Sequence, residues 1–183
     1  MSRLQVKPLS VSAAATASSY ATHWYALQIR HRYEKRVAVQ LRNKNVEVFL
    51  PLRAEVHAWS DRRQPVEIPL FPGYVFVRID RSSGARLTVL NTGGVMSFVN
   101  FGSRAVQVPA KQVEDLQRLL SERVPCSLYP FLRVGQRVRL RGGCLNGLEG
   151  ILDQRDPKHL VISIECIQRA VAIEVSGYEL ELV

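Results

Sequence analysis

Residues 70–77 read LFPGYVFV, and this stretch decides how the first half of the chain folds. Its last four residues are aromatic or β-branched and continuously apolar, which predicts a strand buried on both faces. Pro72 fixes its own φ angle and Gly73 permits an unusual one, so the chain bends sharply ahead of the strand. Phe71 and Tyr74 therefore flank a rigid corner.

The segments on either side of this corner predict an α+β domain. Upstream, residues 23–29 read as a strand, residues 33–42 as a helix with Val37 and Leu41 in its apolar stripe, and residues 46–50 as a strand. Residues 56–59 and 66–68 alternate as in a β-hairpin with a basic tip. Downstream come a weak helix over 81–90, strands at 95–99 and 107–108, and a helix from Pro109 to Glu122. We expect an antiparallel-rich sheet with helices packed on it.

The last third of the chain differs in pattern and predicts a separate unit. Residues 123–132 contain two prolines and read as a linker. Residues 133–183 alternate apolar and polar positions, with frequent glycine and Asp-Pro turns, which is typical of a small β-barrel. We therefore divide the chain into a disordered tail (1–22), a first domain (23–122), a linker (123–132) and a barrel (133–183).

Composition favours a partner with a negative surface. The 183 residues hold 25 Lys plus Arg against 16 Asp plus Glu, a net charge of +9, and such a surplus suits nucleic acid. The three cysteines are widely spaced, which fits neither a metal-ligand pattern nor an even disulfide framework and suits the cytoplasm. We interpret them as ordinary buried or half-buried thiols. No apolar run approaches membrane-spanning length, so we expect no membrane association.

Catalytic signatures are missing from the sequence. The four histidines lie outside any metal-ligand spacing, and no phosphate-binding glycine loop or nucleophile elbow is present. We expect a protein that is not an enzyme and needs no cofactor or metal.

Three segments in order resemble the NusG family of transcription elongation factors. HWYALQI at 23–29 and FPGYVFV at 71–77 resemble its amino-terminal domain, and VRLRGGCLNGLEGIL at 138–152 resembles the KOW motif that opens its carboxy-terminal barrel. The resemblance covers about residues 23–183. It implies an α/β sandwich followed by a KOW β-barrel, and a monomer that docks on RNA polymerase, suppresses pausing and termination, and recruits a partner through the barrel.

The resemblance also implies where the partners bind. In this family an apolar depression receives the tip of the polymerase clamp helices. Adjacent strand positions point to opposite faces, so one of Trp24 and Tyr25 faces the core and the other can join the depression. The implied polymerase-binding residues are Trp24, Tyr25, Phe71, Pro72, Tyr74 and Phe98. The alternative is that these are plain core residues.

Basic residues near that depression are candidates for contacts with phosphates of non-template DNA or nascent RNA. They are His31, Arg32, Lys35, Arg36, Arg62, Arg63 and Arg78. A solvated basic face is the alternative interpretation. In the barrel, the KOW pattern is matched at Gly142 and Gly150 but departs at residues 143–145, where the family usually has Gly-Pro-Phe. Leu145, Leu148 and Ile164 are the candidate exposed contacts for a partner such as a small ribosomal subunit protein. The alternative is that they lie inside, because a small barrel also needs such residues in its core.

Residues 95–102, the short connection 41–46 and the KOW departure resemble the specialised branch typified by RfaH, UpxY and LoaP. We favour an operon-directed antiterminator over a housekeeping NusG factor. A ribosome-associated or RNA-binding KOW protein is the alternative from another class. Because β-branched residues dominate 161–175, we expect a constitutive barrel rather than a helical hairpin that refolds.

Overall fold

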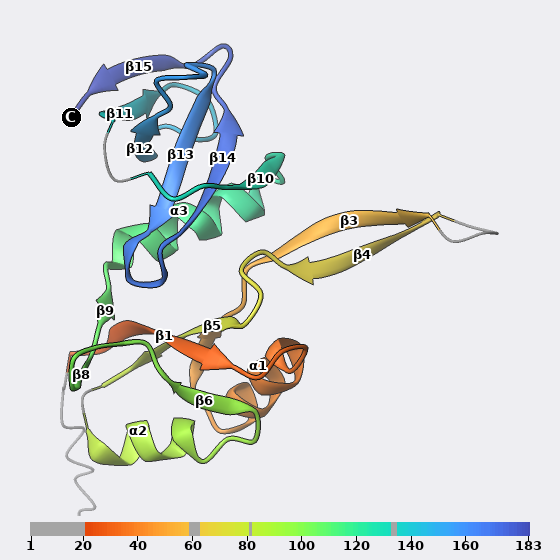
Figure 1. Cartoon of the computed structure of the whole chain (residues 1–183), viewed down its shortest axis with the longest axis vertical. Coiled ribbons are helices and arrows are strands. Elements are labelled where there is room, and N and C mark those ends of the chain that lie inside the picture. The colour runs from red at the N-terminus through yellow and green to blue at the C-terminus, as the bar shows by residue number, and fades with distance from the viewer. Residues whose placement is uncertain (1–20, 59–62, 81, 133–134) are drawn as a thin grey trace, which may run out of the picture.

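The computed structural model describes residues 21–58, 63–80, 82–132 and 135–183. An amino-terminal sheet domain and a carboxy-terminal barrel are stacked, with one long helix between them (Figure 1). The predicted tail up to residue 20, Arg62 and the side chain of Arg63 lie outside the described residues. The predicted α+β fold class is confirmed by the observed elements.

The amino-terminal sheet is antiparallel and centres on the two most apolar strands of the sequence. Its strand order is β2 (Glu47–Phe49), β5 (Tyr74–Ile79), β1 (His23–Ile29) and β6 (Val95–Phe98), and β9 (Gln107–Val108) also pairs with β1. The pair Ala26↔Phe76 fixes the register of β1 against β5. Because both central strands carry apolar residues on both faces, the sheet needs a cover on each side.

Two helices cover one face of this sheet. Helix α1 (Glu34–Asn43) contributes Val37 and Leu41, and α2 (Ser83–Leu90) contributes Val89, to a core that includes Tyr25 and Val75. The hydroxyl of Ser82 accepts a hydrogen bond from the backbone N–H of Ala85, 3.3 Å away, and so caps α2.

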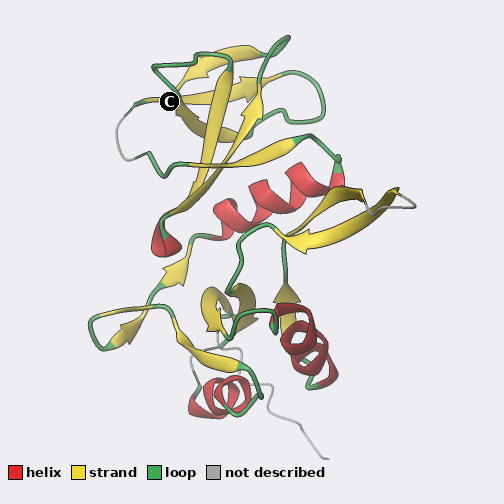
Figure 2. Cartoon of the chain, turned by 45° about the vertical axis from the view of Figure 1, so that its right-hand side comes forward, coloured by secondary structure: helices red, strands yellow, loops and turns green. Residues whose placement is uncertain are grey.

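The third helix, α3 (Ala110–Ser121), covers the opposite face and is also the base of the barrel (Figure 2). Val113, Leu116 and Leu119 are fully buried in one continuous core with Trp24 of β1 and Ile162 of the barrel. The hairpin of β3 (Leu52–Ala58) and β4 (Arg63–Pro69) extends away from both units (Figure 1). A second, small hairpin joins β7 (Asn100–Phe101) to β8 (Arg104–Ala105).

The carboxy-terminal unit is a six-stranded antiparallel sheet in the order β10-β14-β13-β12-β11-β15. The strands are β10 (Cys126–Tyr129), β11 (Gln136–Arg141), β12 (Glu149–Leu152), β13 (His159–Ile164), β14 (Arg169–Glu174) and β15 (Glu179–Leu182), with a short 3-10 helix at Glu165–Ile167. The outermost strand, β10, belongs to the range expected to be a linker. Residues 123–132 thus contribute structure to the barrel.

Gly150 is the KOW glycine whose replacement we expect to disturb the barrel most directly. A Cβ atom at this position would lie 2.7 Å from the carbonyl oxygen of Val161 and 2.8 Å from Cγ of Leu160, so β12 and β13 would have to separate. We expect Gly150→Ala to lower the free energy of unfolding by about 1–3 kcal/mol, as other overpacked sites do. Urea denaturation followed by far-UV circular dichroism measures this change.

Gly84→Ala is the matched control, because a Cβ atom there meets no heavy atom within 4 Å and α2 already gives the residue a helical conformation. We expect this variant to be as stable as the wild type or more stable. Equal stability of the Gly150→Ala variant and the wild type would show that the barrel absorbs the extra methyl group.

Candidate functional site

The corner at residues 71–74 is a tight turn that presents Pro72 at the surface. The backbone N–H of Tyr74 donates to the carbonyl oxygen of Phe71 at 3.1 Å, and Gly73 has a φ of 83°. Proline at the second position and a left-handed glycine at the third are the features of a type II turn. The N–H of Ile29 donates to the carbonyl oxygen of Gly73 at 2.8 Å, which attaches the turn to the end of β1.

A buried carboxylate fixes this corner to the first helix. Glu34 is only 4 % exposed, and its Oε1 accepts a hydrogen bond from the backbone N–H of Gly73 at 2.8 Å. Glu34 begins α1, where the helix dipole favours a negative charge. Glu34 is not among the site residues predicted from the sequence, although an acid in a first helical turn is a recognisable signal. Its partner could not have been inferred, because the two residues lie 39 positions apart.

A groove of about 300 Å³ lies beside the corner and combines apolar and cationic residues. Its lining residues are His31, Arg32, Glu34, Lys35, Ile68, Pro69 and Pro72. Three predicted nucleic-acid residues and one predicted polymerase-binding residue therefore come together here. Ile68 and Pro69, from the base of the β3–β4 hairpin, were not predicted. The lining thus combines apolar side chains with two cations, a histidine and the buried carboxylate of Glu34. Apolar and cationic groups side by side suit a protein surface that carries acidic side chains or lies next to phosphates.

The six aromatic and proline candidates do not form one patch. Trp24 and Phe71 are 5 % and 1 % exposed and lie in the core shared with α3 and the barrel. Tyr25 and Phe98 lie on the other face of the sheet, where their rings meet edge to face with centroids 5.9 Å apart. The structure thus places both Trp24 and Tyr25 in cores, on opposite faces. Pro72 is exposed and Tyr74 is half-buried, so these two candidates are accessible.

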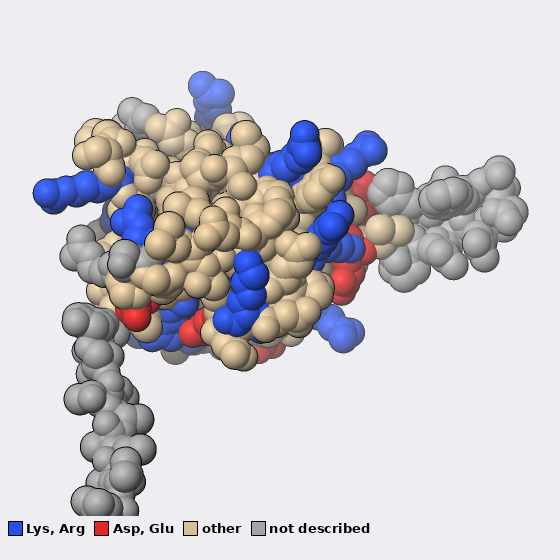
Figure 3. All heavy atoms as spheres, turned by 90° about the horizontal axis from the view of Figure 1, so that it is seen from below, with Lys and Arg blue, Asp and Glu red and all other residues tan. Residues whose placement is uncertain are grey.

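The remaining basic candidates are spread over the amino-terminal domain. Arg36 lies on α1 with its guanidinium 5.6 Å from the ring centroid of Tyr33. Arg78, on β5, donates to the hydroxyl of Thr22 at 3.1 Å and lies 3.8 Å from a carboxylate oxygen of Glu47. Seen from this end of the molecule, Lys and Arg side chains project around a largely uncharged surface (Figure 3). His31, Arg32 and Lys35 are therefore the candidates that share a defined groove.

The three barrel candidates are inside the protein. Leu145, Leu148 and Ile164 are all 0 % exposed and belong to the core beneath the barrel, so the expectation that they are exposed is wrong. The physical reason is that the KOW turn folds toward α3. Its backbone contacts that helix directly: the carbonyl oxygen of Asn146 accepts from Arg118 at 2.6 Å, and that of Gly147 accepts from Lys111 at 3.1 Å.

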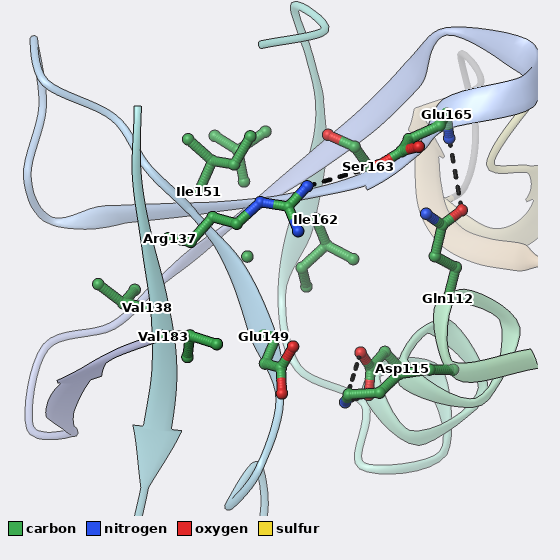
Figure 4. A pocket seen from close by; sticks show the side chains of 13 residues that line it. Gln112, Asp115, Arg137, Val138, Glu149, Ile151, Ile162, Ser163, Glu165 and Val183 are labelled. Carbon is green, nitrogen blue, oxygen red and sulfur yellow. Dashed lines mark hydrogen bonds and ion pairs between the residues drawn. The ribbon is translucent and has the colours of Figure 1, made fainter. Parts of the chain in front are cut away.

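A cavity of about 120 Å³ lies between α3 and the barrel, next to these contacts (Figure 4). Gln112 accepts a hydrogen bond from the backbone N–H of Glu165 at 3.4 Å, and Glu165 pairs with Arg137 at 3.6 Å. Burial raises the pKa of Asp115, while a hydrogen bond from Lys111 opposes that shift. This interface is therefore polar at its edge and apolar at its centre.

Within the described residues, no group of three or more His, Cys, Asp or Glu side chains could hold a metal ion. Burial raises the pKa of Cys126, and raises that of Cys166 to about 11, so neither is an activated thiol. Cys144 is exposed, unlike the buried or half-buried thiol that was expected. Among the described helices, none has the length and apolar character needed to cross a bilayer.

Comparison with known proteins decides the family. The model of the family described as "Transcription termination factor nusG" matches residues 22–117, more than half of the chain. The chain belongs to the NusG family. The corner, Glu34 and the groove all lie within the matched residues. Membership confirms the predicted family and also the prediction that the chain is not an enzyme, because NusG factors are non-enzymatic transcription factors.

Similar NusG proteins span nearly the whole chain. The transcription termination/antitermination protein NusG of Lactococcus lactis is 27% identical over 178 residues, covering 89% of this chain and 94% of that protein. The protein of the same name from Escherichia coli K12 is 26% identical over 174 residues, with 86% and 94% covered. A solved structure titled "Domain interaction in Thermotoga maritima NusG" has a TM-score of 0.53 at 23% identity, with 87% and 97% covered, and supports the fold.

The contact between Glu34 and Gly73 generates a prediction about this NusG site. In a Glu34→Ala variant the N–H of half-buried Gly73 loses its carboxylate acceptor, so we expect the free energy of unfolding of the amino-terminal domain to fall by about 1–3 kcal/mol. Amide hydrogen exchange at Gly73 should accelerate accordingly. Lys35→Ala, at the next and exposed position, is the control and should change stability by less than about 0.5 kcal/mol. Unchanged exchange at Gly73 in the alanine variant would contradict the role given to Glu34.

Proposed function

We propose that this chain is an elongation and antitermination factor that docks on the clamp helices of RNA polymerase through its amino-terminal domain. The observation that carries this proposal is the rigid corner at residues 71–74, held by Glu34 beside a groove that is lined by apolar and cationic side chains. Family membership supports it, and the relatives reported above are named transcription termination/antitermination proteins.

The geometry favours docking on the exposed side of the corner. Pro72, Ile68 and Pro69 supply apolar surface of the kind that interfaces bury, and the cations that line the same groove supply polar contacts. Trp24 and Phe71 contribute to docking in a different way. Both lie under α3, so they contact a partner only in an arrangement in which α3 and the barrel have moved off the sheet.

The cations that line the groove support a contact with nucleic acid next to the polymerase. His31, Arg32 and Lys35 line the groove, and Arg36 follows one residue further along α1. Attraction between these side chains and phosphates requires no base recognition and weakens with salt. Non-template DNA or nascent RNA close to the clamp is the proposed partner, and Arg62, Arg63 and Arg78 extend the same role.

We further propose that this factor belongs to the specialised branch and acts on particular operons rather than on transcription in general. Residues 95–102 and the departure from the KOW pattern at 143–145 support this assignment. The barrel recruits a second partner, for which a small ribosomal subunit protein is the candidate. A housekeeping NusG role is the competing proposal. Transcription in vitro distinguishes the two roles, because only the specialised factor depends on the leader sequence of its operon.

Capture of core RNA polymerase by the immobilised full-length chain tests the docking surface. We expect Tyr74→Ala and Pro72→Ala to weaken capture, by about tenfold or more for the tyrosine if it acts as an aromatic anchor. Phe71→Ala is a poor probe because truncating a fully buried phenylalanine costs about 3–5 kcal/mol of stability. Leu182→Ala is the matched control, since Leu182 is a large exposed side chain (66 %) on β15 of the barrel, outside the amino-terminal domain.

Circular dichroism must first show that each variant is folded. Equal capture of polymerase by the wild type and by folded Tyr74→Ala and Pro72→Ala variants would exclude the corner as the docking surface. Failure of the wild type to bind polymerase, together with retention of ribosomes or RNA, would favour the KOW-protein alternative.

A further inference from the structure

The segment that connects α3 to the barrel, residues 122–135, contributes the edge strand of the barrel sheet. Its strand β10 pairs antiparallel with β14, from Cys126↔Ile173 to Tyr129↔Ala170. The other side of β14 pairs with β13, so β10 is the outermost strand on this side (Figure 1). Without β10, the backbone N–H and C=O groups on that edge of β14 would be unpaired, and such an edge is a template for another strand.

The same segment covers a second apolar surface of the barrel. Val161, Ala170 and Ala172 are at most 2 % exposed and form a cluster separate from the main core. Tyr129, Phe131 and Leu132 pack against this cluster. The neighbouring strand residues Ile162 and Val171 belong to the inner core, as the alternation of a strand requires. The barrel sheet is therefore apolar on both faces here, and the segment 126–132 is the cover of the outer face.

The side chain of Tyr129 attaches residues 126–132 to the barrel. The hydroxyl of Tyr129 donates a short hydrogen bond to Oδ2 of Asp153, and its ring stacks on that of His159 with centroids 6.4 Å apart. The bond raises the pKa of Tyr129 and lowers that of Asp153. Asp153 also accepts from the backbone N–H of Arg155 at 2.9 Å, so the acceptor is held in position independently of the tyrosine.

The segment that pairs with the edge of β14 is also part of the covalent connection between α3 and the barrel. Residues 122–135 are the covalent connection from α3 to β11. While β10 is paired, that connection is anchored on the barrel close to α3. If β10 were released, the same residues could span roughly 45 Å when extended. Occupancy of the β14 edge therefore controls how far the barrel can move from α3 and the amino-terminal domain.

We propose that the edge of β14, together with the outer cluster Val161, Ala170 and Ala172, is a docking site for an extended segment of a partner protein, and that residues 126–132 occupy it as an internal ligand. A partner strand adds to β14 by main-chain hydrogen bonds and places an aromatic side chain in the position of Tyr129. Its binding displaces β10 and lengthens the free connection between α3 and the barrel, so that this connection no longer limits how far the barrel can move. The site is distinct from the corner and groove, and it goes beyond the proposed docking on polymerase.

The chemistry of the site selects a polypeptide rather than a nucleic acid. Two carboxylates lie close to the Tyr129 ring. Asp153 accepts the hydrogen bond of the tyrosine hydroxyl, and Oδ2 of Asp156 is 2.8 Å from Nδ1 of His159, whose ring stacks on that of Tyr129. Two carboxylates disfavour phosphates, whereas Oδ2 of Asp153 accepts from a hydroxyl. The internal ligand defines the partner: an extended segment with a tyrosine, followed within three residues by further large apolar side chains.

A peptide with the sequence of residues 124–132, labelled with a fluorophore, is the probe, and the full-length chain is the receptor. The apparent dissociation constant equals the intrinsic one divided by the fraction of molecules with a free edge. In Tyr129→Ala the internal ligand loses its ring and its bond to Asp153. We expect this variant to bind the peptide about tenfold more tightly than the wild type, or better, in fluorescence anisotropy, because its edge is free more often.

Two matched variants test whether the contacts of Tyr129 with Asp153 and His159 account for the expected change in peptide affinity. Tyr129→Phe keeps the ring and removes only the hydroxyl, so its affinity for the peptide should lie between those of the wild type and Tyr129→Ala. Leu128→Ala changes the adjacent strand residue, whose side chain is 49 % exposed, and should bind like the wild type. A peptide with alanine in place of the tyrosine should not bind any of the three. Circular dichroism controls for folding of each receptor.

Three outcomes would overturn the proposal. Equal peptide affinity of the wild type and Tyr129→Ala would show that residues 126–132 do not compete for the site. Absence of binding to Tyr129→Ala, while hydrogen exchange shows an unprotected β14 edge, would show that the edge does not accept a strand. A dimer of Tyr129→Ala that takes up no peptide would assign the site to a second copy of the chain. None of these experiments contains polymerase, so they leave the proposed function untouched.

The bond between Tyr129 and Asp153 also predicts a pH dependence. The lowered pKa of Asp153 means that its contribution to stability is present at neutral pH and is lost as pH falls through that lowered value. The raised pKa of Tyr129 means that its contribution is lost as pH rises through that raised value. The charged neighbours Asp156 and Arg155 act on the hydroxyl of Tyr129, and the ring of His159 stacks on the tyrosine ring. Phenolate absorbance is titrated in the wild type and in Tyr129→Phe, and the second curve is subtracted from the first. The difference should show one tyrosine with a pKa above the ordinary range, and a difference curve at the ordinary tyrosine pKa would contradict this bond.

Discussion

Helix α3 is buried on two sides, and the arrangement of the whole chain depends on this constraint. Val113, Leu116 and Leu119 are removed from water only if the sheet and the barrel both pack against the helix. The burial of one large aliphatic side chain is worth about 1.5–3 kcal/mol, so exposing one side of α3 is costly unless another apolar surface replaces it. Polar contacts from Lys111, Gln112 and Arg118 then set the orientation of the barrel on the helix.

This packing divides the proposed docking surface of the amino-terminal domain into an accessible and a covered part. The corner around Pro72 and the groove beside it face solvent, because Glu34 fastens them to α1 rather than to α3. Trp24 and Phe71 are under α3. A partner that held the barrel elsewhere would increase the population in which the covered face is free.

The connection between the two units is structured by the barrel itself. Its β10 strand satisfies the backbone groups at the edge of β14, and its aromatic residues cover an outer apolar face that strand alternation alone would leave to solvent. A proline-containing segment that reads as a free spacer thus has a folded state with a defined location. Ala170 and Ala172 provide the room for this cover, because larger side chains on that face would occupy the place of the tyrosine ring.

The sequence by itself determined the elements, the fold class and the family, because these depend on local patterns: apolar periodicity, the Phe-Pro-Gly corner and the turn glycines of the barrel. It also determined that Trp24 and Tyr25 point to opposite faces of the sheet. Only the tertiary structure decided that both are buried, that the barrel candidates Leu145, Leu148 and Ile164 are internal, and that Glu34 holds Gly73. It also placed Tyr129 against Asp153. The physical reason is that burial and pairing depend on which distant surfaces meet, and contacts between residues 24 to 39 positions apart leave no periodic signal in the chain.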